Sequence, residues 1–295
     1  MTSHDAARFL DADALAVRLG DDVPLAGAAP DDAAEPGEAA WIAARVAQAD
    51  PARPARFGGA LLVAPPGVDP ALVPPAATVV VCERPRVAFS RLVAHAFAER
   101  TRPGWPLASP ALPPDAVVGE GVAFAPGVVL GAGVEIGDGC RIGPHAALAH
   151  CTLGRGVEIG PHCTIGTAGF GVSRDADGAL VPFPHVGRVV LEDGVAVGAG
   201  TQIDRGALGE TRVGAGTRID NAVHVAHNAR IGRRCLVIAH AMLAGSVTVG
   251  DDCWIAPGAQ IRNGVAVGAG ATVGMGAVVV RDVPAGATVK GNPAR

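Results

Sequence analysis

The stretch from Val213 to Val279, which begins VGAGTRIDNAVHVAHNARIGRRCLV (213–237), carries an aliphatic residue at every sixth position without exception. These positions are Val213, Ile219, Val225, Ile231, Val237, Leu243, Val249, Ile255, Ile261, Val267, Val273 and Val279. A period of six matches neither the helical period of about 3.6 nor the strand period of two. Fixed self-similarity of this kind is typical of solenoids, and it predicts a parallel β-helix.

A smaller residue follows each aliphatic position at a distance of four residues. These smaller residues are Thr217, Val223, Ala229, Cys235, Ala241, Val247, Cys253, Ala259, Val265, Ala271 and Ala277. We therefore expect each hexapeptide to send one large and one small side chain inward. The Gly, Asp, Asn, Arg and Pro residues between them form the turns. Three hexapeptides would make one coil of 18 residues.

Composition argues against several classes of function. The 295-residue chain has a net charge of −4, only 3% aromatic residues and no tyrosine, and it contains no basic run. We therefore expect no nucleic acid partner. Met1–Leu10 lack the pattern of a signal peptide, and no apolar run approaches the length of a membrane helix. The sequence predicts a cytoplasmic protein without membrane insertion.

The cysteines are expected to be core residues. Cys140, Cys163, Cys235 and Cys253 all occupy the small inward position of a repeat. Buried, reduced thiols are therefore favoured over a disulfide framework. No pair has the spacing of a zinc site, so the sequence predicts no metal.

Residues 1–108 lack the period and predict a small α/β domain. Its expected elements are a short capped helix at Asp11–Leu19, buried strands at Ala60–Val63 and Thr78–Cys82, and an amphipathic helix at Arg86–Arg100. The passage from Pro103 to Pro114 predicts a linker, because repeated proline interrupts helices and strands.

The six-residue period begins again at Val118 and predicts a β-helix over residues 109–285, followed by a C-terminal tail over 286–295. The period is interrupted by Gly166–Arg188, a segment rich in glycine, proline and polar residues. Loops of this length are usually functional or disordered, and the aromatic residues here favour function. A shorter insertion spans Arg205–Glu210.

Five short strings then point to a family. They are Gly169-Phe-Gly, Pro184-His-Val-Gly-Arg, Ile203-Asp-Arg-Gly-Ala, Ile219-Asp-Asn and Val225-Ala-His-Asn. In this order and spacing they closely resemble the bacterial UDP-3-O-acylglucosamine N-acyltransferases of lipid A biosynthesis. The resemblance implies a mainly β fold whose solenoid is a left-handed parallel β-helix. It also implies a homotrimer with active sites between chains, and an N-terminal domain that helps bind uridine.

The resemblance also implies the chemistry. Acylation of an amine by a thioester needs a base for the amine proton and donors for the oxyanion of the tetrahedral intermediate. His227 matches the catalytic histidine of the family. A spacing of 18 residues per coil stacks Gly245 beside it. A glycine lets a thioester approach the backbone closely, and the family uses the equivalent amide as an oxyanion donor.

Further residues match positions by which the family binds the sugar or orients the base. They are Asp220, Asn221, His224 and Asn228, together with His185 in the long loop. Asn and Asp also stabilise solenoid corners by bonding backbone groups, so both roles stay open for them. His145, His162 and His240 occupy the turn position that glycine fills in other repeats, and we interpret them as solvated corner residues.

The chain departs from the family pattern in its N-terminal domain. The family stacks uracil on aromatic residues and bonds it with an asparagine. Here Trp41 can stack, but Ala44 and Ala47 offer neither contact. Gly264 replaces a second histidine common in the family, and Ala168 replaces an aspartate before Gly169-Phe-Gly.

The C-terminal sequence points to a second possible acyl donor. Family members continue into helices that help receive acyl carrier protein, whereas this sequence ends Val289-Lys-Gly-Asn-Pro-Ala-Arg. That string resembles the ending of coenzyme-A-dependent hexapeptide acetyltransferases. Lys290 and Arg295 are therefore candidates to bind the phosphates of the coenzyme.

The sequence favours an N-acyltransferase that moves an acyl group from acyl carrier protein to UDP-3-O-acyl-glucosamine. The acyl-phosphopantetheine thioester is a co-substrate, and no tightly bound cofactor is expected. One alternative is a coenzyme-A-dependent N-acyltransferase acting on another nucleotide amino sugar. An alternative of another class is a non-catalytic, trimeric sugar-binding scaffold.

Overall fold

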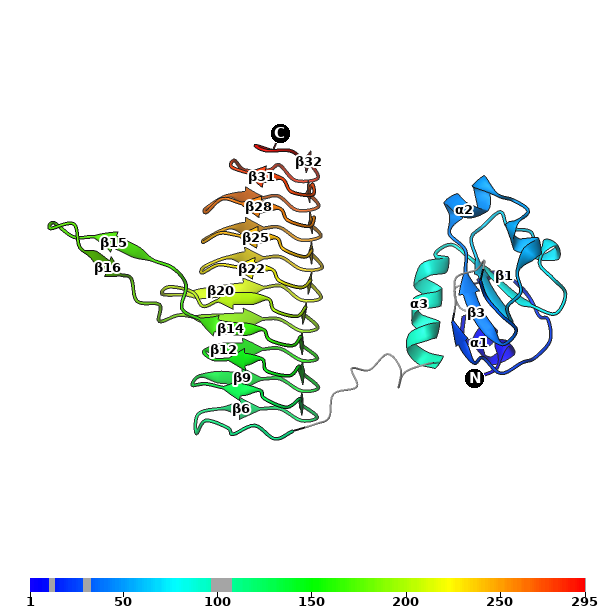
Figure 1. Ribbon diagram of the computed structural model, residues 1–295, viewed down its shortest axis with the longest axis horizontal. Helices are drawn as coiled ribbons and strands as arrows, with labels where there is room; N and C mark the ends of the chain where they lie inside the picture. The colour runs from blue at the N-terminus through cyan, green and yellow to red at the C-terminus, as the bar shows by residue number, and fades with distance from the viewer. Residues whose placement is uncertain (11–13, 29–32, 97–107, 295) are drawn as a thin grey trace. The chain divides into compact units, whose positions relative to one another are not determined.

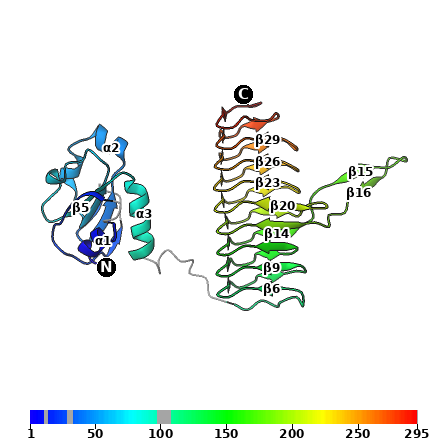
Figure 2. The ribbon, with the colours of Figure 1, turned by 180° about the vertical axis from the view of Figure 1, so that it is seen from behind.

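The chain divides into two compact units, Met1–Gly104 and Trp105–Arg295. The computed structural model describes residues 1–295 apart from 11–13, 29–32, 97–107 and 295. Figure 1 shows a small α/β unit and a stack of short strands, and Figure 2 shows the same elements from behind. Each unit has a hydrophobic core of its own.

The N-terminal unit is a five-stranded sheet with helices. Its elements are α1 (Ser3–Leu10), β1 (Ala14–Arg18), β2 (Gly27–Ala28), β3 (Glu38–Trp41), α2 (Ala44–Ala49), 3-10 helices at Arg53–Arg56 and Pro70–Leu72, β4 (Leu61–Ala64), β5 (Thr78–Cys82) and α3 (Pro85–Ala96). The strand order is β1-β5-β4-β3-β2, and only β1 runs antiparallel to its neighbour. Strands β4 and β5 are buried along their whole length, as parallel strands covered on both faces should be.

Two of the expected strands and one helix of this unit are confirmed. Strands β4 and β5 coincide with the apolar runs that predicted them. The helix expected at Arg86–Arg100 is present as α3 up to Ala96, and the rest of that range lies outside the described residues. Side chains of α1 and α3 pack on one face of the sheet, in the cluster that includes Ala7 and Leu92.

The short helix expected at Asp11–Leu19 is wrong. Within the described part of that range, residues 14–18 form β1 on the edge of the sheet, antiparallel to β5. Arg18 ties the strand down, because its guanidinium donates to the carbonyl oxygens of Val73, Pro74 and Ala77. The free sheet edge offers ladder hydrogen bonds that outweigh the intrinsic helix preference of alanine and leucine, because tertiary context overrides local propensity.

The second unit is a parallel β-solenoid with three sheets. The first sheet holds β6 (Val117–Val118), β9 (Val134–Ile136), β12 (Cys151–Leu153), β17 (Arg188–Leu191), β20 (Glu210–Val213), β23 (Arg230–Ile231), β26 (Thr248–Val249) and β29 (Ala266–Val267). The second holds β7 (Ala123–Phe124), β10 (Arg141–Ile142), β13 (Glu158–Ile159), β18 (Ala196–Val197), β21 (Arg218–Ile219), β24 (Leu236–Val237), β27 (Trp254–Ile255), β30 (Thr272–Val273) and β32 (Thr288–Val289). The third holds β8 (Val129–Leu130), β11 (Ala147–Leu148), β14 (Thr164–Thr167), β19 (Gln202–Asp204), β22 (His224–Val225), β25 (Met242–Leu243), β28 (Gln260–Ile261) and β31 (Val278–Val279).

The register and the core of the solenoid confirm the hexapeptide pattern. Val225 pairs with Leu243, and Leu243 pairs with Ile261, so neighbouring coils are offset by the expected 18 residues. The aliphatic positions from Val213 to Val279 are at most 4% exposed. The smaller residues between them are equally buried. Each inward pair therefore packs on the pair above and the pair below.

The four repeat cysteines are confirmed as buried thiols. Burial raises the pKa of Cys235 to about 11 and also raises the pKa of Cys140, Cys163 and Cys253. A thiol that stays protonated is a poor nucleophile, so these cysteines serve packing.

The corner histidines lie where the sequence places them. His145, His162 and His240 are exposed and have φ angles of 58°, 56° and 61°. Gly200 and Gly258 fill the equivalent turns in the next coils with φ 68°. This left-handed conformation favours glycine, and the histidines adopt it only as single turn residues.

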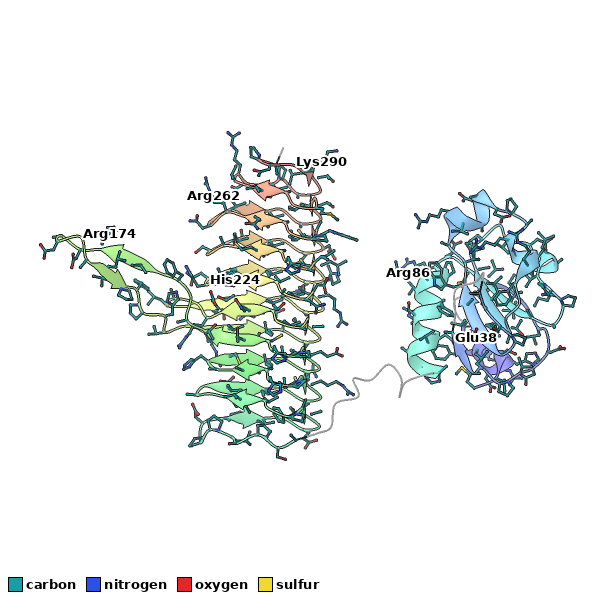
Figure 3. All side chains as sticks on the ribbon, viewed as in Figure 1. Glu38, Arg86, Arg174, His224, Arg262 and Lys290 are labelled. Carbon is teal, nitrogen blue, oxygen red and sulfur yellow. The ribbon has the colours of Figure 1, made fainter. Side chains whose placement is uncertain are left out.

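Both insertions leave the solenoid at one edge. There the strands of the third sheet turn into the first, and we call it the long-loop edge. Strand β14 ends at Thr167 and β17 begins at Arg188, so the long loop spans residues 168–187. Its strands β15 (Val172–Arg174) and β16 (Leu180–Pro182) form an antiparallel hairpin that projects from the stack (Figure 1), with Arg174 on the hairpin (Figure 3). The shorter loop spans residues 205–209.

The solenoid continues past residue 285, where the sequence places its end. Val283 is 4% exposed, and β32 pairs with β30. Ala287, Val289 and Ala294 pack against the core, so the segment expected to be a tail closes the last coil. Among the helices that the structure describes, none has the length and apolar character to cross a membrane.

Replacing Leu243 with alanine is expected to lower the free energy of unfolding by about 2–5 kcal/mol, because the side chain is fully buried and leaves a cavity. The loss is measured by urea unfolding, with circular dichroism as the probe. The matched control is Met275→Ala, whose side chain is 76% exposed, with an expected change within about 0.5 kcal/mol. Equal losses in the two variants would contradict the assignment of the core.

Candidate active site

His227 lies at the long-loop edge, in the turn between β22 and β23. Val225 points into the core, and Asn228 adopts a left-handed conformation with φ 62°. The His227 side chain is half-buried. Its carbonyl oxygen accepts a hydrogen bond from the Ser246 amide of the next coil at 2.9 Å, which anchors the turn.

Two glycines flank the His227 ring. A Cβ atom added to Gly245 would lie 2.7 Å from Cε1 and 2.9 Å from Nε2 of the ring. A Cβ atom added to Gly169 would lie 2.8 Å from Cδ2. Any larger residue at either place would push the imidazole away, so glycine permits this close approach. The expected stacking of residue 245 beside residue 227 is confirmed.

Asn228 contacts the other nitrogen of the His227 ring. Its Nδ2 lies 3.1 Å from His227 Nδ1. Its Oδ1 accepts a hydrogen bond from the Ala207 amide in the shorter loop at 2.8 Å. An amide offers both a donor and an acceptor, so Asn228 orients the imidazole without placing a charge on it.

His185 comes from the long loop and meets His227 edge to face. The ring centroids are 5.1 Å apart, with an angle of 68° between the planes. His185 Nδ1 lies 3.0 Å from the Phe183 carbonyl oxygen. Its Nε2 is buried and has no hydrogen-bond partner among the described residues. The long loop therefore contributes directly to the surroundings of His227.

Asp204, at the end of β19, is a site residue that sequence reasoning did not select. Its side chain is only 11% exposed, and its Oδ2 lies 3.7 Å from His224 Nε2. The Thr167 hydroxyl donates to its Oδ1 at 3.4 Å. Burial raises the pKa of Asp204, while His224, Thr167 and other nearby histidines oppose that shift. Its place within the string Ile203-Asp-Arg-Gly-Ala was the signal that could have found it.

Asp220 and Asn221 lie at a different edge from His227, between the second and third sheets. Asp220 accepts hydrogen bonds from the amides of Asn221 and Ala239 at 2.8 and 3.2 Å. Asn221 Oδ1 accepts from the Ala199 amide at 2.7 Å. In the single chain these two side chains stabilise the corner of the coil, and the chain does not bring them to His227.

Three candidates remain, which are Trp41, Lys290 and Arg295. Trp41 ends β3 in the N-terminal unit and packs partly against its core. Lys290 is exposed and follows β32 in the last coil, several coils from His224 (Figure 3). Arg295 lies outside the described residues.

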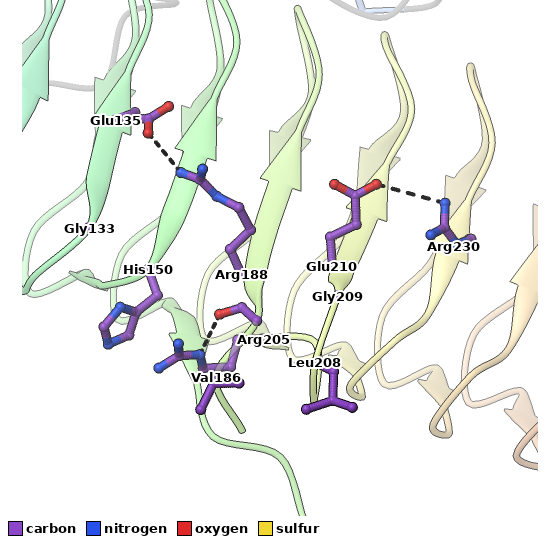
Figure 4. A pocket seen from close by; sticks show the side chains of 11 residues that line it. Gly133, Glu135, His150, Val186, Arg188, Arg205, Leu208, Gly209, Glu210 and Arg230 are labelled. Atoms are coloured by element: carbon purple, nitrogen blue, oxygen red, sulfur yellow. Dashed lines mark hydrogen bonds and ion pairs between the residues drawn. The ribbon is translucent and has the colours of Figure 1, made fainter. Parts of the chain in front are cut away.

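A charged cavity of about 700 Å³ opens beside the long-loop edge (Figure 4). Its ionisable lining residues are Glu135, His150, Arg188, Arg205, Glu210 and Arg230. Arg188 pairs with Glu135 at 3.0 Å, and Arg230 lies 3.7 Å from Glu210. Arg205 Nε donates to the Gly187 carbonyl oxygen at 2.6 Å and so joins the two loops. Arg188 and Arg205 belong to strings that carry the family resemblance, but no individual site residue proposed from the sequence is among the residues that line this cavity.

Metal ligation finds no support in the part of the chain that the structure describes. No group of three or more His, Cys, Asp or Glu side chains is arranged there to hold an ion.

Comparison with known proteins agrees with the solenoid. Residues 115–150 and 246–281 match the family model for the bacterial transferase hexapeptide (six repeats). The UDP-N-acetylglucosamine acyltransferase of Bacteroides fragilis is 25% identical, with a TM-score of 0.57, over 63% of this chain and 71% of that one.

Two relatives specify the family further. The UDP-3-O-acylglucosamine N-acyltransferase of Caulobacter vibrioides is 45% identical over 241 residues, which are 76% of this chain and 70% of the relative. The protein of the same name from Caulobacter sp. strain K31 is 41% identical over 130 residues, which are 44% of this chain and only 38% of that relative. By its similarity to the C. vibrioides protein over most of both chains, this chain belongs to the UDP-3-O-acylglucosamine N-acyltransferase family.

Proposed function

We propose that the chain transfers an acyl group from a thioester to the amine of UDP-3-O-acyl-glucosamine, a step of lipid A biosynthesis. The observation that carries the proposal is the half-buried His227 ring held between Gly169 and Gly245. Similarity to the family supports the identity of the substrate.

His227 acts as the general base. As the amine attacks the thioester carbon, a C–N bond forms and the nitrogen becomes acidic. His227 takes the proton released from the nitrogen and later gives it to the departing thiolate, so the base is restored when the C–S bond breaks. Asn228 supports the ring by its contact with Nδ1.

The Gly245 amide stabilises the oxyanion of the tetrahedral intermediate. Among the described residues, no group accepts a hydrogen bond from this amide. Gly245 lies beside the His227 ring, so a backbone donor and the base are close together. A preorganised donor at this place is worth more than a water molecule, because it need not reorient during the reaction.

The acyl donor is acyl carrier protein carrying the acyl-phosphopantetheine thioester, and the working form is a homotrimer. A trimer would supply the groups that a single chain leaves at other edges, among them Asp220 and Asn221. The exposed apolar residues near the long-loop edge, such as Phe170 at 86% and Leu208 at 72%, would be covered in such an assembly or by the acyl chain.

A coenzyme A thioester is the second candidate donor. The exposed Lys290 in the last coil favours it, because a lysine there is free to bind the phosphates of the coenzyme. The nucleotide amino sugar would then differ as well, because Ala44 and Ala47 stand where uracil contacts are expected.

His227→Ala is expected to lower kcat by about 10²-fold or more, because the amine proton loses its acceptor. The loss is measured by monitoring amide formation on UDP-3-O-(3-hydroxyacyl)-glucosamine with mass spectrometry. His162→Ala removes an exposed corner histidine in a lower coil and should leave the rate unchanged. If neither wild type nor the His227 variant turns over any amino sugar, the result would support a non-catalytic scaffold and contradict the proposed enzyme.

Gly245→Ala is expected to lower kcat by about tenfold or more, because its methyl group would displace the His227 ring and a small misplacement is costly. Gly209→Ala is the matched control, since a Cβ atom there meets nothing within 4 Å. Unchanged activity in the Gly245 variant, with an unaltered thermal midpoint in both, would remove Gly245 from the proposed mechanism.

The donor is tested by offering the protein a 3-hydroxyacyl carrier protein or the matching acyl-coenzyme A. We expect amide from the carrier protein, and Lys290→Ala should then change its kcat/KM little. Turnover with coenzyme A alone, weakened by Lys290→Ala because a charge-assisted contact is lost, would establish the second candidate instead.

A further inference from the structure

Asp204 is a largely buried carboxylate that lies next to His224 in the candidate site. Only 11% of its side chain is exposed, and β19 places it between β14 and β22 in the third sheet. The groups that interact with its charge are His224, Thr167, His227 and His185. Three of these four are imidazoles, contributed by β22, by its turn and by the long loop.

The proposed mechanism is favoured by a negative charge near His227, and Asp204 can supply that charge. When His227 takes a proton it becomes an imidazolium, which a nearby negative charge stabilises. The nitrogen of His227 that faces Asn228 meets a neutral amide instead of a carboxylate. In a buried place, charges interact more strongly than across water, so Asp204 can act on the ring without touching it.

The contacts of Asp204 locate His224, and a separate ring contact locates His185. Thr167 donates to Oδ1, which leaves Oδ2 directed toward His224 Nε2 at 3.7 Å. His185 packs on His227 with its own Nε2 buried and without a hydrogen-bond partner among the described residues. Direct contacts therefore join Asp204 to Thr167 and His224, and a further contact joins His185 to His227. Strand β19, which ends at Asp204, pairs with β22, which leads into His227, so the two groups lie on neighbouring strands of one sheet.

We propose that Asp204 is a positioning residue for the transfer reaction: its carboxylate orients His224 and stabilises the proton that His227 takes from the amine. This inference rests on the proposed function, because it assumes that His227 takes a proton from the amine. The position of Asp204 on the strand paired with β22, which leads into His227, does not depend on that function.

Asp204→Asn tests the link, because it removes the charge and keeps an oxygen that accepts from Thr167. The whole protein, labelled with ¹³C in its histidine rings, is titrated by NMR, and the signals are assigned with His185→Gln, His224→Gln and His227→Gln. The His227 midpoint should move to lower pH by about half a unit or more, because loss of a nearby negative charge disfavours the protonated ring. An unmoved midpoint would overturn the proposal.

The kinetic arm uses the same variant. We expect kcat to fall by about tenfold, the acidic limb of the pH–rate profile to move to lower pH and KM to change little, since Asp204 does not touch substrate. Asp252→Asn is the matched control, because its exposed carboxylate pairs with Arg234 on the solenoid surface. A fall in rate without movement of the acidic limb would mean that Asp204 has a structural role only.

The two proposals fail in distinguishable ways. If His227→Ala keeps full activity, the proposed base is wrong, whatever Asp204→Asn does to the NMR midpoint. If His227→Ala is inactive and Asp204→Asn changes neither the midpoint nor the acidic limb, the proposed function stands and the role of Asp204 is wrong.

Discussion

The stacking of one inward pair of side chains on the next is the interaction on which this solenoid depends. Each coil presents aliphatic residues such as Val225 and Leu243 at the same place, and the parallel ladder keeps them 18 residues apart. A shift of one residue would turn the aliphatic row outward, so burial specifies the register strongly. The same register fixes the positions of the surface residues on the coils.

The candidate site depends on this register. His227 and Gly245 are far apart along a turn-rich sequence, yet they touch because they occupy equivalent turns in adjacent coils. The two loops add what the repeat does not provide: the long loop brings Gly169 and His185, and the shorter loop bonds Asn228 through Ala207. The repeat therefore acts as a rigid frame, and irregular segments supply the chemistry.

Charged side chains on the solenoid surface differ from Asp204 in their exposure to water. Pairs such as Arg234 and Asp252 lie exposed on the solenoid surface, where water weakens them. Asp204 is different, because only 11% of its side chain is exposed and it contacts Thr167 and His224. Burial gives this carboxylate an influence on its neighbours that no exposed acid in the described coils shares.

Much of this protein can be predicted from the sequence alone. The period of six determined the solenoid, the buried cysteines, the corner histidines and the contact between residues 227 and 245, because a repeated core leaves one register. The tertiary structure alone decided three other features. Residues 14–18 became an edge strand, since β5 offered free ladder bonds. The corner of Asp220 lies away from His227. Asp204 is only 11% exposed and contacts Thr167 and His224, because strands β14 and β22 bring these residues to either side of it, and the period of six does not select a carboxylate at this place.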